Sequence, residues 1–269
     1  MDPKELFARI YVRSMKGQLL IDSFRQVAEL GRPHAAKVLG EKAKSIALEV
    51  SARQSGGSPA DDVKAVLEGM SPQQLVTSIL GKTLDHAQAA LDAASIVFAH
   101  SLVDSAAYDC CRVAACLAPT EWLPWVENRT LPLSEIKGRS FDELLDQKLN
   151  EFISGLERDS LLKKVDLLFA LCRPPKKWAP IEDFAFNHDR LVSLDRLRHE
   201  IVHGERVGRS IPSCEKNIDY LVRTPFFLMG LVTFRYKLEL DKQSVARLLF
   251  GPGPWRIVNG VAYSEERED

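Results

Sequence analysis

The sequence predicts a mainly α-helical fold: a helical bundle with an N-terminal helical extension and a small C-terminal β-hairpin. Two observations support this prediction. Apolar residues recur at helical spacing along most of the chain, between recognisable helix starts and stops. Only the tail, PWRIVNGVAYS, places short β-prone runs on either side of an Asn-Gly turn. With 269 residues, 45% of them hydrophobic, the chain is long enough to bury a substantial core.

The first 80 residues are expected to form an N-terminal helical segment. Gly31-Arg32-Pro33 is a helix stop, because proline cannot donate the next hydrogen bond of the ladder. SGGSP is a flexible break. The helices expected in this segment cover residues 3–30, 33–52, about 60–69 and about 72–80.

Residues 82–250 are expected to form the bundle, and residues 251–269 the tail with its hairpin. The segment APTEWLPWVENRTLPLSE (118–135) predicts an irregular connector whose tryptophans, Trp122 and Trp125, cover the core. RPPKKWAP (173–180) predicts a second break. The helices expected in the bundle cover residues 83–117, about 140–154, 157–172, 187–203, 213–239 and 241–249.

Charge and cysteine usage are typical of a cytosolic protein. The net charge of −1 means that any nucleic-acid function must come from a local patch. The five cysteines include no C-x-x-C pair, and the neighbouring Cys110 and Cys111 are expected to be small apolar residues of a core in a reducing compartment. MDPKELFARI lacks the pattern of a signal peptide, and charges interrupt the most apolar stretch, residues 87–118. We therefore expect a cytoplasmic protein with no membrane partner.

The stretch DRLRHEIVHGE (195–205) contains two overlapping patterns. His199 and His203 with Glu200 between them spell H-E-x-x-H, in which two histidines on one helical face bind zinc and the glutamate activates water. No third ligand follows, because the positions for a metzincin glycine and histidine hold Arg206 and Arg209. The cation of Arg198 beside the first histidine also opposes binding of Zn²⁺. We therefore treat the zinc protease as the weaker hypothesis and expect no metal.

Arg198 gives the second pattern, because it falls on the apolar face of the predicted helix. A projection at about 100° per residue places it among Leu191, Leu194 and Leu197. A guanidinium there is costly unless it is paired, since arginine keeps its charge. One explanation is an ion pair with Asp195, one turn earlier. The other is an anion-binding site in a cleft or at an interface.

His203 projects about 140° away from Arg198 on an ideal helix. It lies next to Gly204, where a helix ends easily and a side chain can be redirected. If the two side chains converge, they suit cleavage of a phosphodiester. The guanidinium would hold phosphate oxygens, and the imidazole would transfer protons near neutral pH.

The segment LRHEIVHG resembles the active-site motif of the HEPN superfamily, R-x(4–6)-H, in which Asn, Asp or His commonly follows the arginine. The motif lies late in a helical bundle, before a long final helix, and the resemblance covers about residues 82–245. It implies a metal-independent endoribonuclease without a cofactor, in which the RNA 2′-OH attacks the adjacent phosphate. The products would be a 2′,3′-cyclic phosphate and a 5′-OH.

The resemblance also implies roles for individual residues and a setting. Arg198 would stabilise the phosphate, His203 would be the acid/base and His199 a polar auxiliary. Two subunits usually contribute to one site in this family, so we expect a homodimer. The family also implies bacterial toxin–antitoxin or antiviral defence systems, with an antitoxin or another regulator as a possible partner.

Other polar residues complete the predicted site. In the predicted helix over 83–117, Asp109 falls inside the apolar stripe and is the candidate partner of Arg198 or His203, although burial with a local hydrogen-bond partner is an equal alternative. The other four histidines, His100 among them, are expected to be ordinary surface or core residues. The candidate RNA-binding cations that flank the motif are Arg196, Arg206, Arg209, Lys176 and Lys177. Two alternatives to the ribonuclease stay open, a non-catalytic HEPN-like module that dimerises or binds a nucleotide, and the zinc protease.

Overall fold

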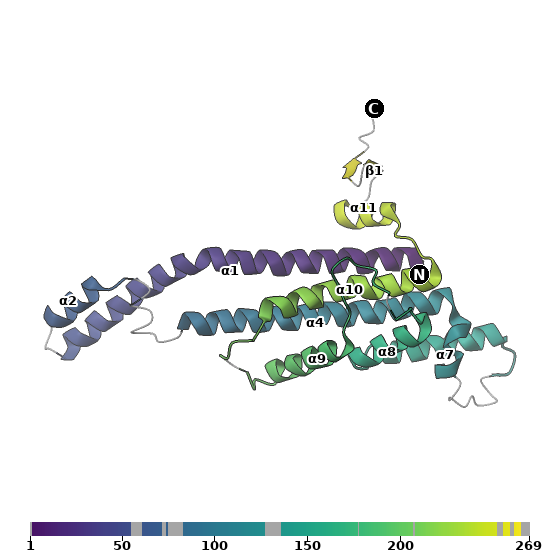
Figure 1. The fold of residues 1–269 in the computed structure, drawn as a ribbon, viewed down its shortest axis with the longest axis horizontal. Helices are drawn as coiled ribbons and strands as arrows, with labels where there is room; N and C mark the ends of the chain where they lie inside the picture. Colours follow the sequence, from purple (N-terminus) through teal and green to yellow (C-terminus); the bar gives the residue numbers. More distant parts are fainter. Residues whose placement is uncertain are drawn as a thin grey trace. The chain divides into compact units, whose positions relative to one another are not determined.

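The computed structural model describes residues 2–54, 61–71, 74, 83–126, 136–176, 178–206, 208–251, 255–258 and 261–264. The protein is mainly α-helical, as the sequence predicts (Figure 1). Its elements are α1 (Pro3–Gln54), α2 (Asp61–Gly69), α4 (Thr83–Leu117), η1 (Pro119–Trp122), α5 (Leu123–Val126), α7 (Phe141–Leu156), α8 (Leu161–Cys172), α9 (His188–Val202), α10 (Cys214–Tyr236), α11 (Lys242–Phe250), β1 (Trp255–Val258) and β2 (Val261–Ser264). No helix in these ranges is both long enough and apolar enough to cross a bilayer.

The chain forms two compact units. Unit 1 contains Met1–Gln18, Phe98–His199 and Glu215–Asp269, and unit 2 contains Leu19–Val97 and Glu200–Cys214. This division differs from the expected one near residue 80, because the long helices α1 and α4 each contribute residues to both units.

Helix α1 corrects the prediction of two helices over 3–30 and 33–52. It runs without a break from Pro3 to Gln54 and contains Pro33. A proline inside a helix removes one backbone hydrogen bond and costs about 3 kcal/mol. The residues around Pro33 are rich in alanine, leucine, lysine and glutamate, which favour helix, and the proline itself is exposed. The predicted short helix at about 72–80 lies almost entirely outside the described residues.

The helix starts in unit 1 follow the capping residues that the sequence supplies. Ser140 and Glu143 form a capping box at α7, in which each side chain accepts a hydrogen bond from the other residue's backbone N–H. The side chain of Ser160 caps α8, so this helix starts later than the expected residue 157. The side chain of Asp241 caps α11.

The connector after α4 is more regular than expected. Residues 119–126 form the short helices η1 and α5, whereas residues 127–135 lie outside the described part. Trp122 is fully buried and packs edge to face with Trp125, at 6.1 Å between ring centroids, and with Phe152, at 6.0 Å. The role in covering the core that we expected of the tryptophans is confirmed for Trp122.

The predicted hairpin is present at the end of the chain. Strands β1 and β2 pair antiparallel, with Trp255 opposite Ser264 and Val258 opposite Val261. This register leaves a two-residue connection, the length that an Asn-Gly turn suits. Asn259 and Gly260 themselves lie outside the described residues.

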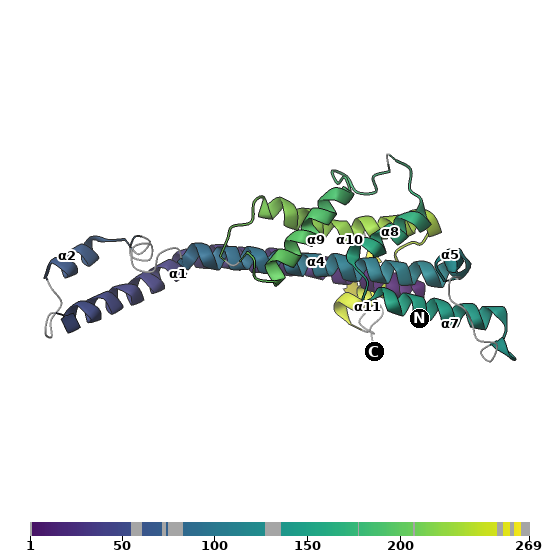
Figure 2. The same ribbon diagram turned by 90° about the horizontal axis from the view of Figure 1, so that it is seen from below.

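The core of unit 1 is built around α4. Its buried residues are mostly small, and Cys110 and Cys111 are fully buried free thiols, as expected. Small side chains let neighbouring helices approach α4 on several sides. Both ribbon views show α9 beside α4 (Figures 1 and 2).

Several contacts lie within unit 2. Arg32 pairs with Asp85 at 3.4 Å between Nη2 and Oδ1, linking α1 to the start of α4. The Sγ atom of Cys214 donates to the carbonyl of Asp92 at 3.9 Å. Gly208, at φ 70°, lies against the ring of His86. The contacts of Cys214 and Gly208 attach the segment after α9 to the first turns of α4.

A buried ion pair links α8 to α4 within unit 1. Lys164 is 1% exposed, and its Nζ atom lies 2.7 Å from Oδ1 of Asp104 and 3.4 Å from the carbonyl of Glu157. Asp104 is more accessible, with 38% of its side chain exposed. Loss of the ion pair therefore costs more free energy at Lys164 than at Asp104, because water can solvate the carboxylate of Asp104 but not the ammonium of Lys164.

We expect the substitution Asp104→Ala to lower the free energy of unfolding by about 3 kcal/mol, since it leaves the buried ammonium of Lys164 without its counter-ion. The substitution Lys164→Met should cost clearly less, because it removes the buried charge and leaves a solvated carboxylate. Urea denaturation followed by circular dichroism measures both values. Equal losses in the two variants would contradict this asymmetry.

Candidate functional site

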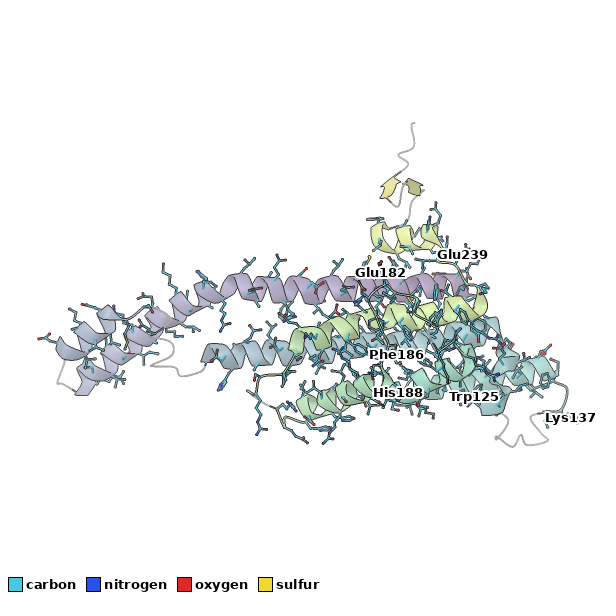
Figure 3. The ribbon with its side chains drawn as sticks, viewed as in Figure 1. Trp125, Lys137, Glu182, Phe186, His188 and Glu239 are labelled. Carbon is cyan, nitrogen blue, oxygen red and sulfur yellow. The ribbon has the colours of Figure 1, made fainter. Side chains whose placement is uncertain are left out.

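The motif lies at the end of α9, and the start of this helix is firmly anchored in unit 1. The side chain of Asn187 accepts a hydrogen bond from the backbone N–H of Arg190 at 2.9 Å, so Asn187 is the N-cap of α9. The hydroxyl of Tyr220 in α10 donates to the carbonyl of Asn187 at 2.7 Å. Leu191 and Leu194 are buried beneath the helix. Figure 3 shows His188 at this start, where its ring lies 3.1 Å from Asp166.

The end of α9 is a Schellman motif, in which the backbone folds back on the last turn. The N–H of Glu205 donates to the carbonyl of Glu200 at 2.9 Å, and that of Gly204 to the carbonyl of Ile201 at 3.1 Å. Gly204 has φ 77°, which glycine adopts without steric cost. The predicted helix stop at Gly204 is therefore confirmed, and His203 is the residue between the helix and this turn.

Arg198 has one nitrogen atom that the rest of the site leaves unsatisfied. The side chain is half-buried, and its Nε atom is buried with no hydrogen-bond partner among the described residues. A buried donor without a partner costs about 1–3 kcal/mol. An anion that accepted a hydrogen bond from this atom would recover that cost.

A histidine and a carboxylate lie beside Arg198. His100 of α4 is 5% exposed, and its Nε2 atom lies 2.9 Å from Oδ1 of Asp195 in α9. We expected Asp195 as a possible ion-pair partner of Arg198, and the structure places it in a hydrogen bond with His100. His100 was expected to be an ordinary surface or core histidine, and it is a core histidine with a hydrogen-bond partner.

Burial lowers the pKa of His100, and the positive charge of Arg198 lowers it further. The carboxylate of Asp195 acts in the opposite direction, by its charge and by the hydrogen bond. The net lowering favours a neutral ring at pH 7, with Nε2–H donating to Asp195. The same hydrogen bond holds the carboxylate of Asp195 close to α4.

Asp109 has other partners than the expected ones. Its Oδ2 atom lies 2.7 Å from Nη2 of Arg13 in α1, and its Oδ1 atom lies 3.2 Å from Nη1 of Arg112. Asp109 is buried, as its place in the apolar stripe predicted. The expectation that it pairs with Arg198 or His203 is corrected, because both of its oxygen atoms already have arginine partners within unit 1.

The remaining motif residues lie at the surface. His199 is exposed and is the last α9 residue of unit 1, whereas His203 is exposed and belongs to unit 2. The apolar face predicted for α9 is narrower than expected, since Leu191 and Leu194 are buried but Val202 is 51% exposed. The helix thus ends with exposed side chains.

The zinc-protease pattern finds no additional ligand in the part of the chain that is described. Glu200, which would be its base, has Oε2 at 2.6 Å from Nε of Arg206. Among the described residues, no group of three or more His, Cys, Asp or Glu side chains is arranged to hold a metal ion.

The candidate RNA-binding cations are spread over both units. Arg196 and Lys176 of unit 1 are exposed, and so is Arg209 of unit 2. Arg206 pairs with Glu200, so its charge is partly compensated. Lys177 lies outside the described residues.

Sequence reasoning missed the pairing of His100 with Asp195. A signal was available, since His100 falls at helical spacing between Ile96 and Val103, two residues of the apolar side of α4. A histidine at a buried position needs a polar partner. The spacing could not indicate that this partner lies 95 positions further along the chain.

The chain matches no protein-family model, and no curated protein and no solved structure matches it significantly.

The lowered pKa of His100 predicts how stability changes with pH. Above the ordinary value of 6.5 the ring is neutral in both the folded and the unfolded chain, so stability is fully present. As the pH falls through 6.5, the unfolded chain binds the proton first, and the free energy of unfolding decreases.

We expect the substitution His100→Gln, which keeps a donor for Asp195, to reduce this decrease between about pH 7.5 and pH 5. Urea denaturation at a series of pH values measures it. Parallel stability curves for the wild type and the variant would show that His100 does not contribute.

Proposed function

We propose that the protein is a metal-independent endoribonuclease of the HEPN type, with Arg198 as the phosphate-binding residue and His203 as the acid/base. The observation that carries this proposal is the buried, unpartnered Nε atom of Arg198. It belongs to a cation in a place where a leucine would pack, and a phosphate oxygen is a suitable acceptor for it. The motif RHEIVH, which resembles the family motif, supplies the histidine.

The neighbours of Arg198 support the role of an anion-binding residue. His100 in its neutral form adds no positive charge, and it fixes Asp195 by a hydrogen bond. Asp195 therefore limits the positive charge around Arg198 without forming the bidentate pair that would occupy the guanidinium. Arg198 thus keeps hydrogen-bonding capacity for an anion from outside.

In the proposed reaction the 2′-oxygen of the RNA attacks the adjacent phosphorus atom, and the bond from phosphorus to the 5′-oxygen breaks. A neutral imidazole of His203 takes the proton from the 2′-OH, and a protonated imidazole gives a proton to the leaving 5′-oxygen. Arg198 stabilises the charge that develops on the phosphate oxygens. The products are a 2′,3′-cyclic phosphate and a 5′-OH, and no metal enters any step.

A homodimer would give this site both protonation states at once. His203 is exposed at the end of α9, so a second subunit can contribute its own copy to a composite site. One imidazole would then act as base and the other as acid. The exposed cations Arg196, Arg209 and Lys176 would contact other phosphates of the RNA. Cleavage in the cytoplasm, under the control of an antitoxin or another regulator, belongs to the same proposal.

One observation favours a non-catalytic relative of this enzyme as the second candidate. Val202 is 51% exposed at the last residue of α9, and a partner that packed on this end of the helix would cover it. A module that only dimerises through α9 would use Val202 in this way. Such a module would cut no RNA, although the substitution Val202→Asp would still weaken its dimer.

We expect the purified protein to cut RNA in the presence of EDTA and to leave 2′,3′-cyclic phosphate ends. The substitutions Arg198→Ala and His203→Ala should each reduce the cleavage rate by about 100-fold or more, because each removes a group that acts in the transition state. Gel assays with end-labelled RNA and analysis of the termini measure both effects.

Arg196→Ala is the matched control, since Arg196 lies two positions before Arg198 and is exposed. It should lower cleavage only to the extent that one phosphate contact is lost, and it should lower the salt dependence as well. Cleavage that persists unchanged in both Arg198→Ala and His203→Ala would refute the mechanism. Stoichiometric zinc in the purified protein would favour the protease instead.

A further inference from the structure

Unit 1 contains a pocket of about 510 Å³ between the end of α8, the segment 173–187 and α10. This volume lies within the range of about 300–1,000 Å³ that small-molecule sites occupy. The residues of the motif do not line it, so it is separate from the site described above. Figure 3 marks its position by Phe186, which is labelled beside His188 at the start of α9.

Aromatic rings form the inner wall of the pocket. Phe186 stacks on Phe227 with ring centroids 4.7 Å apart and an interplanar angle of 6°, and Phe169 lies 5.2 Å from Phe186. Trp178 packs against Phe227 at 5.3 Å. Phe227 is buried, whereas Phe169, Phe186 and Trp178 are only half-buried. The pocket therefore presents aromatic surface on which a further planar ring can stack.

The charged residues of the pocket are cationic. Arg173 and Lys176 line it, and both are exposed. No carboxylate is among the described residues that line it. The nearby acidic residues Glu182 and Asp183 are not part of the lining. A ligand that complements this pocket therefore has a flat apolar part and an anionic group.

Contacts with α10 fix the segment that forms the outer wall. Arg223 donates from Nη2 to the carbonyl of Glu182 at 2.6 Å and from Nη1 to that of Asp183 at 3.2 Å. Tyr220 accepts a hydrogen bond from the backbone N–H of Asn187 at 3.1 Å as well as donating to its carbonyl. The wall is thus held at several points without a ligand, which lowers the entropic cost of binding.

The other end of the segment is fixed by glycine and proline. A Cβ atom on Gly230 of α10 would lie 3.0 Å from Pro180 and 3.2 Å from Trp178, so the lack of a side chain permits this close packing. Arg173 adopts a left-handed conformation, with φ 44°, and its N–H caps α8 by donating to the carbonyl of Phe169 at 2.9 Å. The backbone therefore directs both Arg173 and Trp178 to the pocket from fixed positions.

We propose that this pocket binds one nucleotide of the RNA substrate. The base stacks on the half-buried rings of Phe169, Phe186 and Trp178, and a phosphate oxygen accepts hydrogen bonds from Arg173 and Lys176. This inference rests on the proposed ribonuclease function in one respect, that the nucleotide belongs to the RNA. Recognition by stacking tolerates every base, because each base has a flat π-face.

Isothermal titration calorimetry with nucleoside 5′-monophosphates tests the pocket without any cleavage. We expect each of the four monophosphates to bind, and adenosine or inorganic phosphate alone to bind at least about tenfold more weakly, since each offers only one of the two interactions. The double substitution Arg173→Gln with Lys176→Gln and the single substitution Phe186→Leu should each raise the Kd of adenosine 5′-monophosphate about tenfold. The double variant changes exposed residues only, so it does not threaten the fold.

Matched controls outside the pocket are Arg158→Gln and Phe141→Leu, both at exposed positions of unit 1, and both should keep the wild-type Kd. A Kd that is unchanged in the pocket variants, or the absence of binding by any monophosphate, would overturn the proposal even if the protein cuts RNA. Binding that depends on the pocket, in a protein that cuts no RNA, would instead refute the endoribonuclease and leave the nucleotide site standing.

Discussion

The hydrogen bond between His100 and Asp195 is the contact on which the position of Arg198 in unit 1 depends. It is a bond of 2.9 Å between a buried ring of α4 and a half-buried carboxylate of α9. Because an unpaired polar group inside a helical core is costly, this bond favours one rotation and one height of α9 on α4. Arg198 lies one turn further along α9, so the same bond places its guanidinium near His100.

Helix α4 is the common partner of three such contacts in unit 1. His100 meets Asp195 of α9, Asp104 meets Lys164 of α8, and Asp109 meets Arg13 of α1. The small side chains of α4 allow neighbouring helices to approach closely. Because they are small, they interdigitate little and do not fix the position of a neighbouring helix along α4. Polar pairs with defined directions supply that register, in the way that a buried polar residue selects one arrangement of a coiled coil.

The two proposed binding elements lie at opposite ends of α9. Arg198 is in its last turns, and the aromatic pocket adjoins the residues just before its start. Arg198 lies ten positions after His188, which corresponds to about 15 Å of helix. Such a distance is spanned by a few nucleotides of an extended strand. This spacing within unit 1 agrees with the proposal that one RNA occupies the pocket and contacts Arg198.

The helical class, most of the helix ends and the choice of Arg198 as a candidate site residue could be predicted from the sequence. These features depend on local chemistry, such as the Ser140 and Asn187 caps, the turn at Gly204 and the apolar spacing that surrounds the arginine. The hydrogen-bond and ion-pair partners of the buried polar residues, in contrast, depend on the tertiary structure. Asp195 pairs with His100, and Asp109 pairs with Arg13 and Arg112. The contacts of Asp195 with His100 and of Asp109 with Arg13 join segments that are distant in the sequence, so the spacing of residues along the chain does not indicate them. Pro33 is a second feature that the sequence did not predict correctly. The helix continues through this proline because the summed helix propensity of the neighbouring residues outweighs its cost. The aromatic pocket likewise could not be predicted, because three segments distant in the sequence form it. In the sequence, each of these segments has the pattern of an ordinary core helix or loop.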